Sequence, residues 1–166
     1  MQMLQVLQVV AMMFVAVSMA LSLAHALEYP GKMRLTKQEY LAAQTIYYPG
    51  FTFGGIAEIG SILTLGVLAP MLRGSGLAFW LTLAAFVAMV GLEAVYWLVT
   101  HPVNNFWLKN VTLKAPGARF FGFGAQRAGG REPEWTELRD RWEMSHMMRA
   151  VLGVAGFLLL TISLVI

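Results

Sequence analysis

The stretch FTFGGIAEIGSILTLGVLAPML at residues 51–72, followed after RGSG by LAFWLTLAAFVAMVGLEAVYWLVT at residues 77–100, decides the fold. Each run has the roughly 20 residues that a helix needs to cross a bilayer. Each run also contains one carboxylate, Glu58 or Glu93, about two helical turns or ~10 Å from its membrane edge. A carboxylate in hydrocarbon costs several kcal/mol unless it is paired, protonated or bound to a metal, so both positions indicate a functional site.

Composition extends this reading to the whole chain. Hydrophobic residues make up 58% of the 166 residues, charged residues only 13%, and the mean hydropathy is +0.63. We predict helices at about residues 4–28, 51–72, 77–101 and 134–166, with a short interfacial helix at about 37–47. The expected fold class is all-α: one integral membrane four-helix up-down-up-down bundle over residues 1–166. No positive charge precedes the first apolar run, so we expect a retained helix and not a cleaved signal peptide.

The basic residues predict the orientation. Lys32, Arg34 and Lys37 follow the first helix, eight more Lys or Arg residues lie between the third helix and the fourth span, and only Arg73 lies on the other side. The positive-inside rule then places both long connections in the cytoplasm and both termini outside, as expected in a bacterial inner membrane. These charges flank spans and show no nucleic-acid-binding motif, so no nucleic-acid partner is expected. The absence of cysteine excludes disulfides and thiolate chemistry.

The two long connections have different patterns. Thr36 and Glu39 have capping-box spacing, which predicts the short helix at 37–47. The Gly- and Arg-rich segment Phe120–Glu132 is typical of a mobile loop. Pro133 favours a helix start there, so the fourth helix should extend into the cytoplasm before it enters lipid.

Polar residues from all four helices should converge at the cytoplasmic end of the bundle, including every histidine of the chain. The residues we expect to carry catalysis are His25, Glu58, Glu93, His101, Asn104, His146 and Arg149.

Three chemistries fit this layer. A dinuclear metal site would use a Glu from each of two helices and Glu-x-x-His from the others; the candidate ligands are Glu28, Glu58, Glu93, Glu143, His146 and His25. A cofactor-free pocket would move protons with buried carboxylates and histidines. A structural layer would pair Glu58 and Glu93 with Arg149 or a histidine. Haem between His25 and His146 explains the carboxylates less well.

Several segments resemble a known family. These are HALEYPGKMRL (25–35), YLAAQTIY (40–47), HPVNN (101–105) and LRDRWEMSHMMRA (138–150). They are similar to segments of small bacterial membrane proteins of the anthrone oxygenase-like family, many of which are known only as a domain of unknown function. The resemblance covers nearly the whole chain and implies a four-helix membrane fold. Fungal members are regarded as oxygenases that convert anthrones to anthraquinones without an obvious metal or organic cofactor.

The predicted function is oxidation or oxygenation of a lipophilic small molecule, such as a phenol. The expected partners are this molecule and the lipid bilayer that surrounds the bundle. Two cofactor hypotheses stay open, namely no cofactor and a dinuclear metal, and haem is the less favoured third. The rival hypothesis is a non-enzymatic membrane subunit or ligand-binding protein whose polar layer only holds the helices in register. Homo-oligomerisation and a membrane partner stay open.

Overall fold

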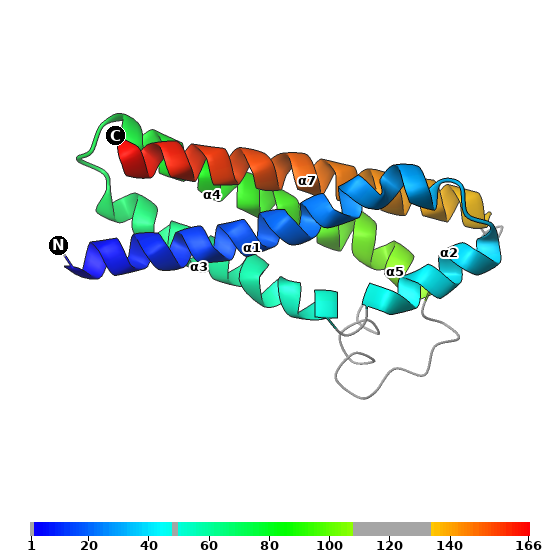
Figure 1. The fold of residues 1–166 in the computed structure, drawn as a ribbon. Coiled ribbons are helices and arrows are strands. Elements are labelled where there is room, and N and C mark those ends of the chain that lie inside the picture. Colours follow the sequence, from blue (N-terminus) through cyan, green and yellow to red (C-terminus); the bar gives the residue numbers. More distant parts are fainter. Residues whose placement is uncertain (1, 48–49, 108–133) are drawn as a thin grey trace.

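The computed structural model describes residues 2–47, 50–107 and 134–166, and within these ranges every regular element is helical (Figure 1). Four helices in the described part of the chain are long and apolar enough to cross a membrane. They are α1 (Gln2–Lys32), α3 (Gly54–Met71), α4 (Leu77–Val95) with its continuation, and α7 (Trp135–Val165). The all-α prediction is confirmed, and the four apolar helices fit an integral membrane protein that associates with the lipid bilayer.

The long helices form a closed ring of neighbours. Helix α1 packs against α7 and α3, and α4 packs against the same two helices. Both chain termini lie at one end of the bundle, and α2 (Lys37–Gln44) lies at the other (Figure 1). The up-down-up-down order and the sidedness in a membrane stay predictions.

The first connection begins with the predicted capping box. The hydroxyl of Thr36 accepts a hydrogen bond from the backbone N–H of Glu39 at 3.4 Å, and the Thr36 N–H donates to the Glu39 carboxylate at 2.8 Å. Helix α2 follows, and the 3₁₀ turn η1 (Thr45–Tyr47) continues it, which confirms the helix predicted at residues 37–47. A second 3₁₀ turn, η2 (Gly50–Phe53), leads into α3.

Two helical segments continue past their predicted ends, and each continuation contains a proline. Helix α1 includes Pro30 and runs to Lys32, four residues beyond the predicted end at 28. After α4 comes a π-helical segment, η3 (Tyr96–Thr100), and then α5 (His101–Trp107), which contains Pro102. The His101 N–H donates to the Tyr96 carbonyl five residues back, and this wider turn relieves the clash that a proline ring makes in an α-helix.

The start of α7 agrees with the prediction to within one residue. Glu134 has an extended conformation at the N-cap, and Trp135 is the first helical residue. The predicted loop Phe120–Glu132 and the predicted role of Pro133 lie outside the described residues.

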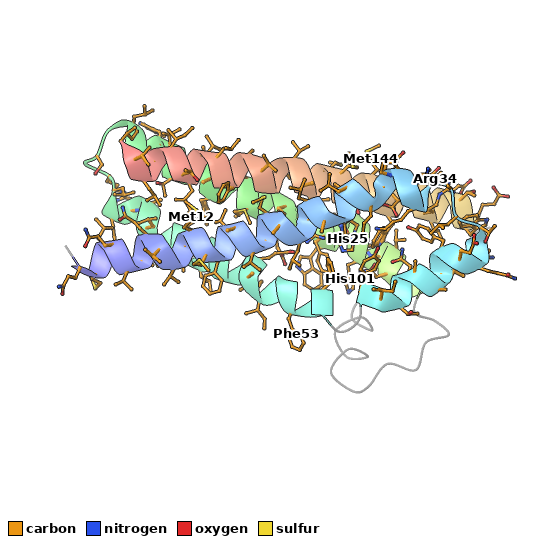
Figure 2. The ribbon with its side chains drawn as sticks, in the orientation of Figure 1. Met12, His25, Arg34, Phe53, His101 and Met144 are labelled. Atoms are coloured by element: carbon orange, nitrogen blue, oxygen red, sulfur yellow. The ribbon has the colours of Figure 1, made fainter. Side chains whose placement is uncertain are left out.

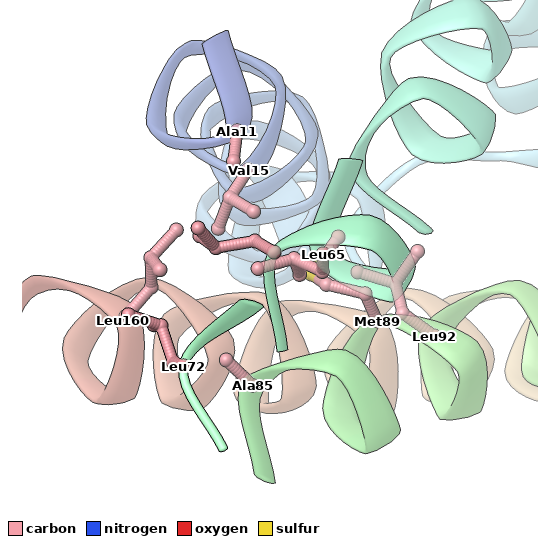
Figure 3. Packing of buried hydrophobic residues seen from close by; sticks show 9 residues of the cluster. Ala11, Val15, Leu65, Leu72, Ala85, Met89, Leu92 and Leu160 are labelled. Atoms are coloured by element: carbon pink, nitrogen blue, oxygen red, sulfur yellow. The ribbon is translucent and has the colours of Figure 1, made fainter. Parts of the chain in front are cut away.

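The apolar core lies toward the termini and uses small and medium side chains from all four long helices (Figure 3). Its centre contains Val15 of α1, Leu65 of α3, Met89 of α4 and Leu160 of α7, all fully buried. At Gly153 the backbone of α1 comes so close that an added Cβ would lie 3.1 Å from the Met19 Cα. Such close approach provides the packing that holds helices together in lipid. Figure 2 shows the side chains along the bundle, with His25 and His101 toward the end opposite Met12.

Candidate functional site: a buried histidine and ion-pair cluster

The inner half of the cluster is an ion pair between α3 and α7. The Arg149 guanidinium binds the Glu58 carboxylate, and both side chains are over nine-tenths buried. A second guanidinium nitrogen of Arg149 lies 3.5 Å from Nδ1 of His146. The guanidinium carbon also lies 5.2 Å from the ring centre of Tyr96, within cation–π range. The predicted contact of Glu58 with Arg149 is therefore confirmed.

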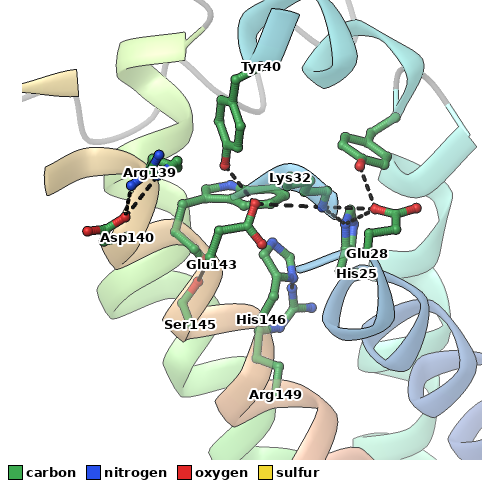
Figure 4. A network of polar contacts seen from close by, with 12 residues as sticks. His25, Glu28, Lys32, Tyr40, Arg139, Asp140, Glu143, Ser145, His146 and Arg149 are labelled. Carbon is green, nitrogen blue, oxygen red and sulfur yellow. Dashed lines mark hydrogen bonds and ion pairs between the residues drawn. The ribbon is translucent and has the colours of Figure 1, made fainter. Parts of the chain in front are cut away.

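The outer half is organised by Lys32, at the end of α1 (Figure 4). Its ammonium lies 2.8 Å from the Glu28 carboxylate and 3.8 Å from the Glu143 carboxylate. Two tyrosines complete these carboxylates: Tyr40 of α2 donates to Glu143 at 2.8 Å, and Tyr47 of η1 donates to Glu28 at 2.5 Å. The outer half therefore ties α1, α2, η1 and α7 together.

Two histidines connect the halves. The ring centres of His25 and His146 are 4.2 Å apart, and the Trp142 ring lies 4.0 Å from His146 and 5.2 Å from His25. Tyr47 and Phe51 each place a ring 4.5 Å from His25. Both histidines are buried, so this aromatic enclosure keeps bulk water away from their nitrogens.

The third polar group lies along α4 and the segment after it. One oxygen of the Glu93 carboxylate accepts a 2.7 Å hydrogen bond from the Trp97 indole, and this carboxyl also lies within hydrogen-bonding reach of Glu58. Asn104 accepts a 2.8 Å hydrogen bond from the Trp142 indole. His101 is buried, with its ring centre 4.9 Å from that of Trp97 and 5.9 Å from that of Tyr96. Glu93 and Asn104 thus join the cluster through Glu58 and Trp142, while His101 lies beside the tryptophan and tyrosine rings.

Burial changes the acidity of the two tyrosines that lie outside the spanning helices. Desolvation, followed by the charge of Glu143, raises the pKa of Tyr40 well above its ordinary value. Desolvation and the hydrogen bond to Glu28 raise the pKa of Tyr47 in the same direction. Both hydroxyls therefore stay neutral donors at physiological pH.

Six buried polar side-chain atoms have no hydrogen-bond partner among the described residues. Leaving such an atom unpaired costs about 1–3 kcal/mol, and a ligand or an ordered water commonly satisfies groups of this kind. Four of the atoms belong to the cluster, namely Glu93 Oε2, Glu143 Oε2, His146 Nε2 and Arg149 Nε, and the other two are Ser22 Oγ and Gln44 Nε2.

Comparison with known proteins identifies the family. The family model described as anthrone oxygenase matches residues 43–159, which is more than half of the chain. The chain belongs to the anthrone oxygenase family. No curated protein and no solved structure matches it.

In this member of the anthrone oxygenase family, the matched range covers one part of the cluster and leaves another part outside. The matched residues include Glu58, Glu93, His101, Asn104, Glu143, His146 and Arg149. His25, Glu28 and Lys32 of α1 precede the matched range. The inner half therefore lies wholly within the family region, whereas the cation of the outer half comes from α1.

The cluster does not fit the dinuclear metal that the sequence suggested. Within residues 2–47, 50–107 and 134–166, no three His, Asp or Glu side chains are arranged to hold a metal ion. Arg149 pairs with Glu58, and Lys32 contacts both Glu28 and Glu143, so three of the four candidate carboxylates already bind cations. Haem does not fit either, because two rings 4.2 Å apart leave no room for a porphyrin between His25 and His146.

The sequence did not predict four residues of the cluster. Lys32 was expected only as a topological charge, and Tyr40, Tyr47 and Trp142 were given no role in the polar layer. A signal for Lys32 was present, because it lies four residues after Glu28 and seven after His25, on the same face of a helix that continues through Pro30.

Proposed function

We propose that this protein is a membrane oxygenase that uses dioxygen to oxidise a lipophilic phenolic or anthrone-like molecule at the histidine and ion-pair cluster. The observation that carries the proposal is the set of unpartnered buried donors and acceptors, which lies in a chain of the anthrone oxygenase family. We place the long connections in the cytoplasm and both termini outside, following the distribution of Lys and Arg.

Anthrone chemistry has clear requirements. The substrate has a CH₂ group opposite its carbonyl, and loss of one proton from this carbon gives an aromatic oxyanion. Dioxygen then oxidises the carbon by four electrons: the CH₂ becomes C=O, and both hydrogens leave in water with the second oxygen atom. A protein catalyst therefore needs a proton acceptor for carbon, and N–H donors for the oxyanion.

The cluster offers both kinds of group. Oε2 of Glu93 has no hydrogen-bond partner among the described residues, so this carboxylate, when it is ionised, can take the carbon proton. Arg149 can only donate, so its contact with His146 Nδ1 makes that nitrogen the acceptor and places the proton of the neutral ring on Nε2. Nε2–H of His146 and Nε–H of Arg149 are then two buried donors available to a developing oxyanion.

The other predicted residues act through these groups. Asn104 holds the Trp142 indole against the ring of His146. Glu58 holds Arg149 in place, and the ring of His25 packs against that of His146. His101 supports the ring of Trp97, the donor to Glu93.

The rival function is a non-enzymatic membrane subunit in which the cluster only fixes helix register. The buried Glu58–Arg149 pair favours it, because such pairs can specify one packing arrangement.

The experiment uses the full chain in lipid nanodiscs with anthrone and ¹⁸O₂. Turnover should exceed the spontaneous oxidation seen in empty nanodiscs, with one ¹⁸O in the new carbonyl and one in water. Glu93→Gln can keep the hydrogen bond from Trp97 but cannot take a proton, so turnover should fall about 10²–10⁴-fold. Glu134→Gln, at the exposed start of α7, is the control and should leave turnover unchanged. Equal rates for the wild-type protein and empty nanodiscs, over a series of hydroxylated anthrones, would overturn the proposal.

A further inference from the structure

Lys32 is the least expected side chain of the cluster, since a lysine is almost never fully buried unless it is paired. It is 5% exposed and lies on the last turn of α1. Its ammonium lies 4.9 Å from the ring centre of Tyr47 and 4.8 Å from that of Trp142. Two carboxylates and two aromatic faces therefore compensate one cation. A lysine that only determines membrane topology can stay exposed to water and needs none of these contacts.

The ammonium can only donate hydrogen bonds, and two acceptors lie within reach of its N–H groups. They are the Glu28 carboxylate at 2.8 Å and Nδ1 of His25 at 3.5 Å, while the Glu143 carboxylate at 3.8 Å adds a negative charge. A lysine ammonium cannot accept a hydrogen bond, so Nδ1 of His25 must be the acceptor. The proton of the neutral imidazole then lies on Nε2.

A competing arrangement exists beside the same nitrogen. The Glu28 carboxylate lies 3.8 Å from Nδ1 of His25, and without a cation it would favour a proton on Nδ1. Lys32 is closer to both groups than they are to each other, and Tyr47 also donates to Glu28. The carboxylate is therefore occupied, and the ammonium determines the tautomer.

The same geometry occurs on the second histidine, where Arg149 faces Nδ1 of His146 at 3.5 Å. We propose that Lys32 is a positioning residue that holds His25 in the Nε2–H tautomer, as Arg149 holds His146. The two adjacent rings then present a pair of neutral N–H donors. That these donors serve a substrate oxyanion rests on the proposed function; the tautomer itself does not.

Charged and titratable groups face His25 from every element that packs against it. Glu28 and Lys32 lie on α1 itself, Tyr47 on η1, and His146, Arg149 and Glu143 on α7. Among these groups, in the described part of the chain, only Lys32 directs an N–H donor at Nδ1 of His25. Its removal should therefore change the tautomer.

The test is ¹⁵N NMR of the full chain, labelled at histidine and held in nanodiscs. The nitrogen shifts of His25, assigned with a His25→Gln variant, report which nitrogen bears the proton. The wild-type protein and Lys32→Arg should show Nε2–H, because a guanidinium also donates. Lys32→Met should shift His25 toward Nδ1–H, directed at Glu28. Lys37→Met, which removes an exposed lysine of α2, is the matched control and should change nothing.

Two results would overturn the proposal: Nδ1–H or a doubly protonated His25 in the wild-type protein, or an unchanged tautomer in Lys32→Met. If Lys32→Met does not fold, the same measurement is made on the double variant Lys32→Met/Glu143→Gln, in which one of the two carboxylates left without a cation is also removed. Turnover is read separately. A histidine in the wrong tautomer costs up to about 10⁴-fold in a serine-protease triad, so Lys32→Met should lose about 10²–10⁴-fold while Lys32→Arg keeps most of the rate. A tautomer change in a protein with no oxygenase activity would keep the positioning role and refute only the proposed function.

Discussion

Replacing Glu58 by Gln tests whether the buried ion pair holds α3 against α7. The substitution keeps the volume and the hydrogen-bonding reach of the side chain but removes its charge. Among the described residues, the guanidinium of Arg149 would then keep its contacts with the His146 nitrogen at 3.5 Å and the Tyr96 ring at 5.2 Å. Neither contact carries a negative charge, so the cation loses its main compensation.

The magnitude follows from burial. The side chains of Arg149 and Glu58 are 7% and 8% exposed, so solvent screens the pair very little. Removing one partner from a buried pair costs about 3–5 kcal/mol, because the other charge stays desolvated. The matched control is Asp140→Asn. Asp140 is 58% exposed in its contact with Arg139, and an exposed pair contributes at most about 1 kcal/mol.

The assay is the free energy of unfolding in mixed micelles, followed by helical circular dichroism during denaturant titration. Glu58→Gln should lower that free energy by about 3–5 kcal/mol, and Asp140→Asn by under about 1 kcal/mol. The double variant Glu58→Gln/Arg149→Met should recover most of the loss, because it leaves no unpaired charge. A Glu58→Gln protein as stable as the wild type would refute the reasoning.

Two other predictions concern packing and pH. Gly153→Ala should destabilise the bundle by about 1–3 kcal/mol in the same assay, because its Cβ would lie 3.1 Å from the Met19 backbone. The control Gly55→Ala, with open space around it, should be neutral or slightly stabilising. Equal effects at the two sites would refute the close-packing argument. The pKa of Tyr40 is raised on folding, so the stability that its neutral hydroxyl contributes is fully present below pH ~10 and is lost as the pH rises above that value. Tyr40→Phe should therefore lose about 1–3 kcal/mol at neutral pH, where Glu143 lacks its donor, and should show a smaller alkaline fall than the wild type; an identical alkaline curve would contradict the shift.

The spans and the capping box could be predicted because each depends on local sequence. Some 20 consecutive apolar residues specify a spanning helix wherever they occur, and Thr36 and Glu39 bond across only three residues. The same holds for Glu58, because a carboxylate inside a span must find a partner. Arg149 is the one basic residue in the apolar run at residues 147–166, and it is the partner that the structure shows.

What the sequence did not predict depends on where helices continue. Proline normally ends a helix, and the fact that α1 continues through Pro30 could not be read from the proline alone. That continuation puts Lys32 on the face of His25 and Glu28 instead of in a solvated loop. Likewise, the π-helical turn before Pro102 lets α5 continue and places Asn104 beside Trp142, a contact between residues 38 positions apart. Tertiary packing decided both cases.

Site and scaffold make different demands on a buried polar layer. A scaffold gains from every satisfied hydrogen bond, and each unsatisfied buried atom costs it about 1–3 kcal/mol. The Glu58–Arg149 pair meets that demand, but Arg149 Nε, His146 Nε2 and Glu93 Oε2 do not, although they belong to the same network. A protein selected only for helix register would gain by replacing these groups with apolar ones. The double variant Glu58→Gln/Arg149→Met therefore separates the two functions. A scaffold should fold and hold its helices in register as before. An oxygenase should also fold but should lose its turnover, because the guanidinium donor is gone. Wild-type turnover in that variant would refute the assignment of Arg149 to the reaction.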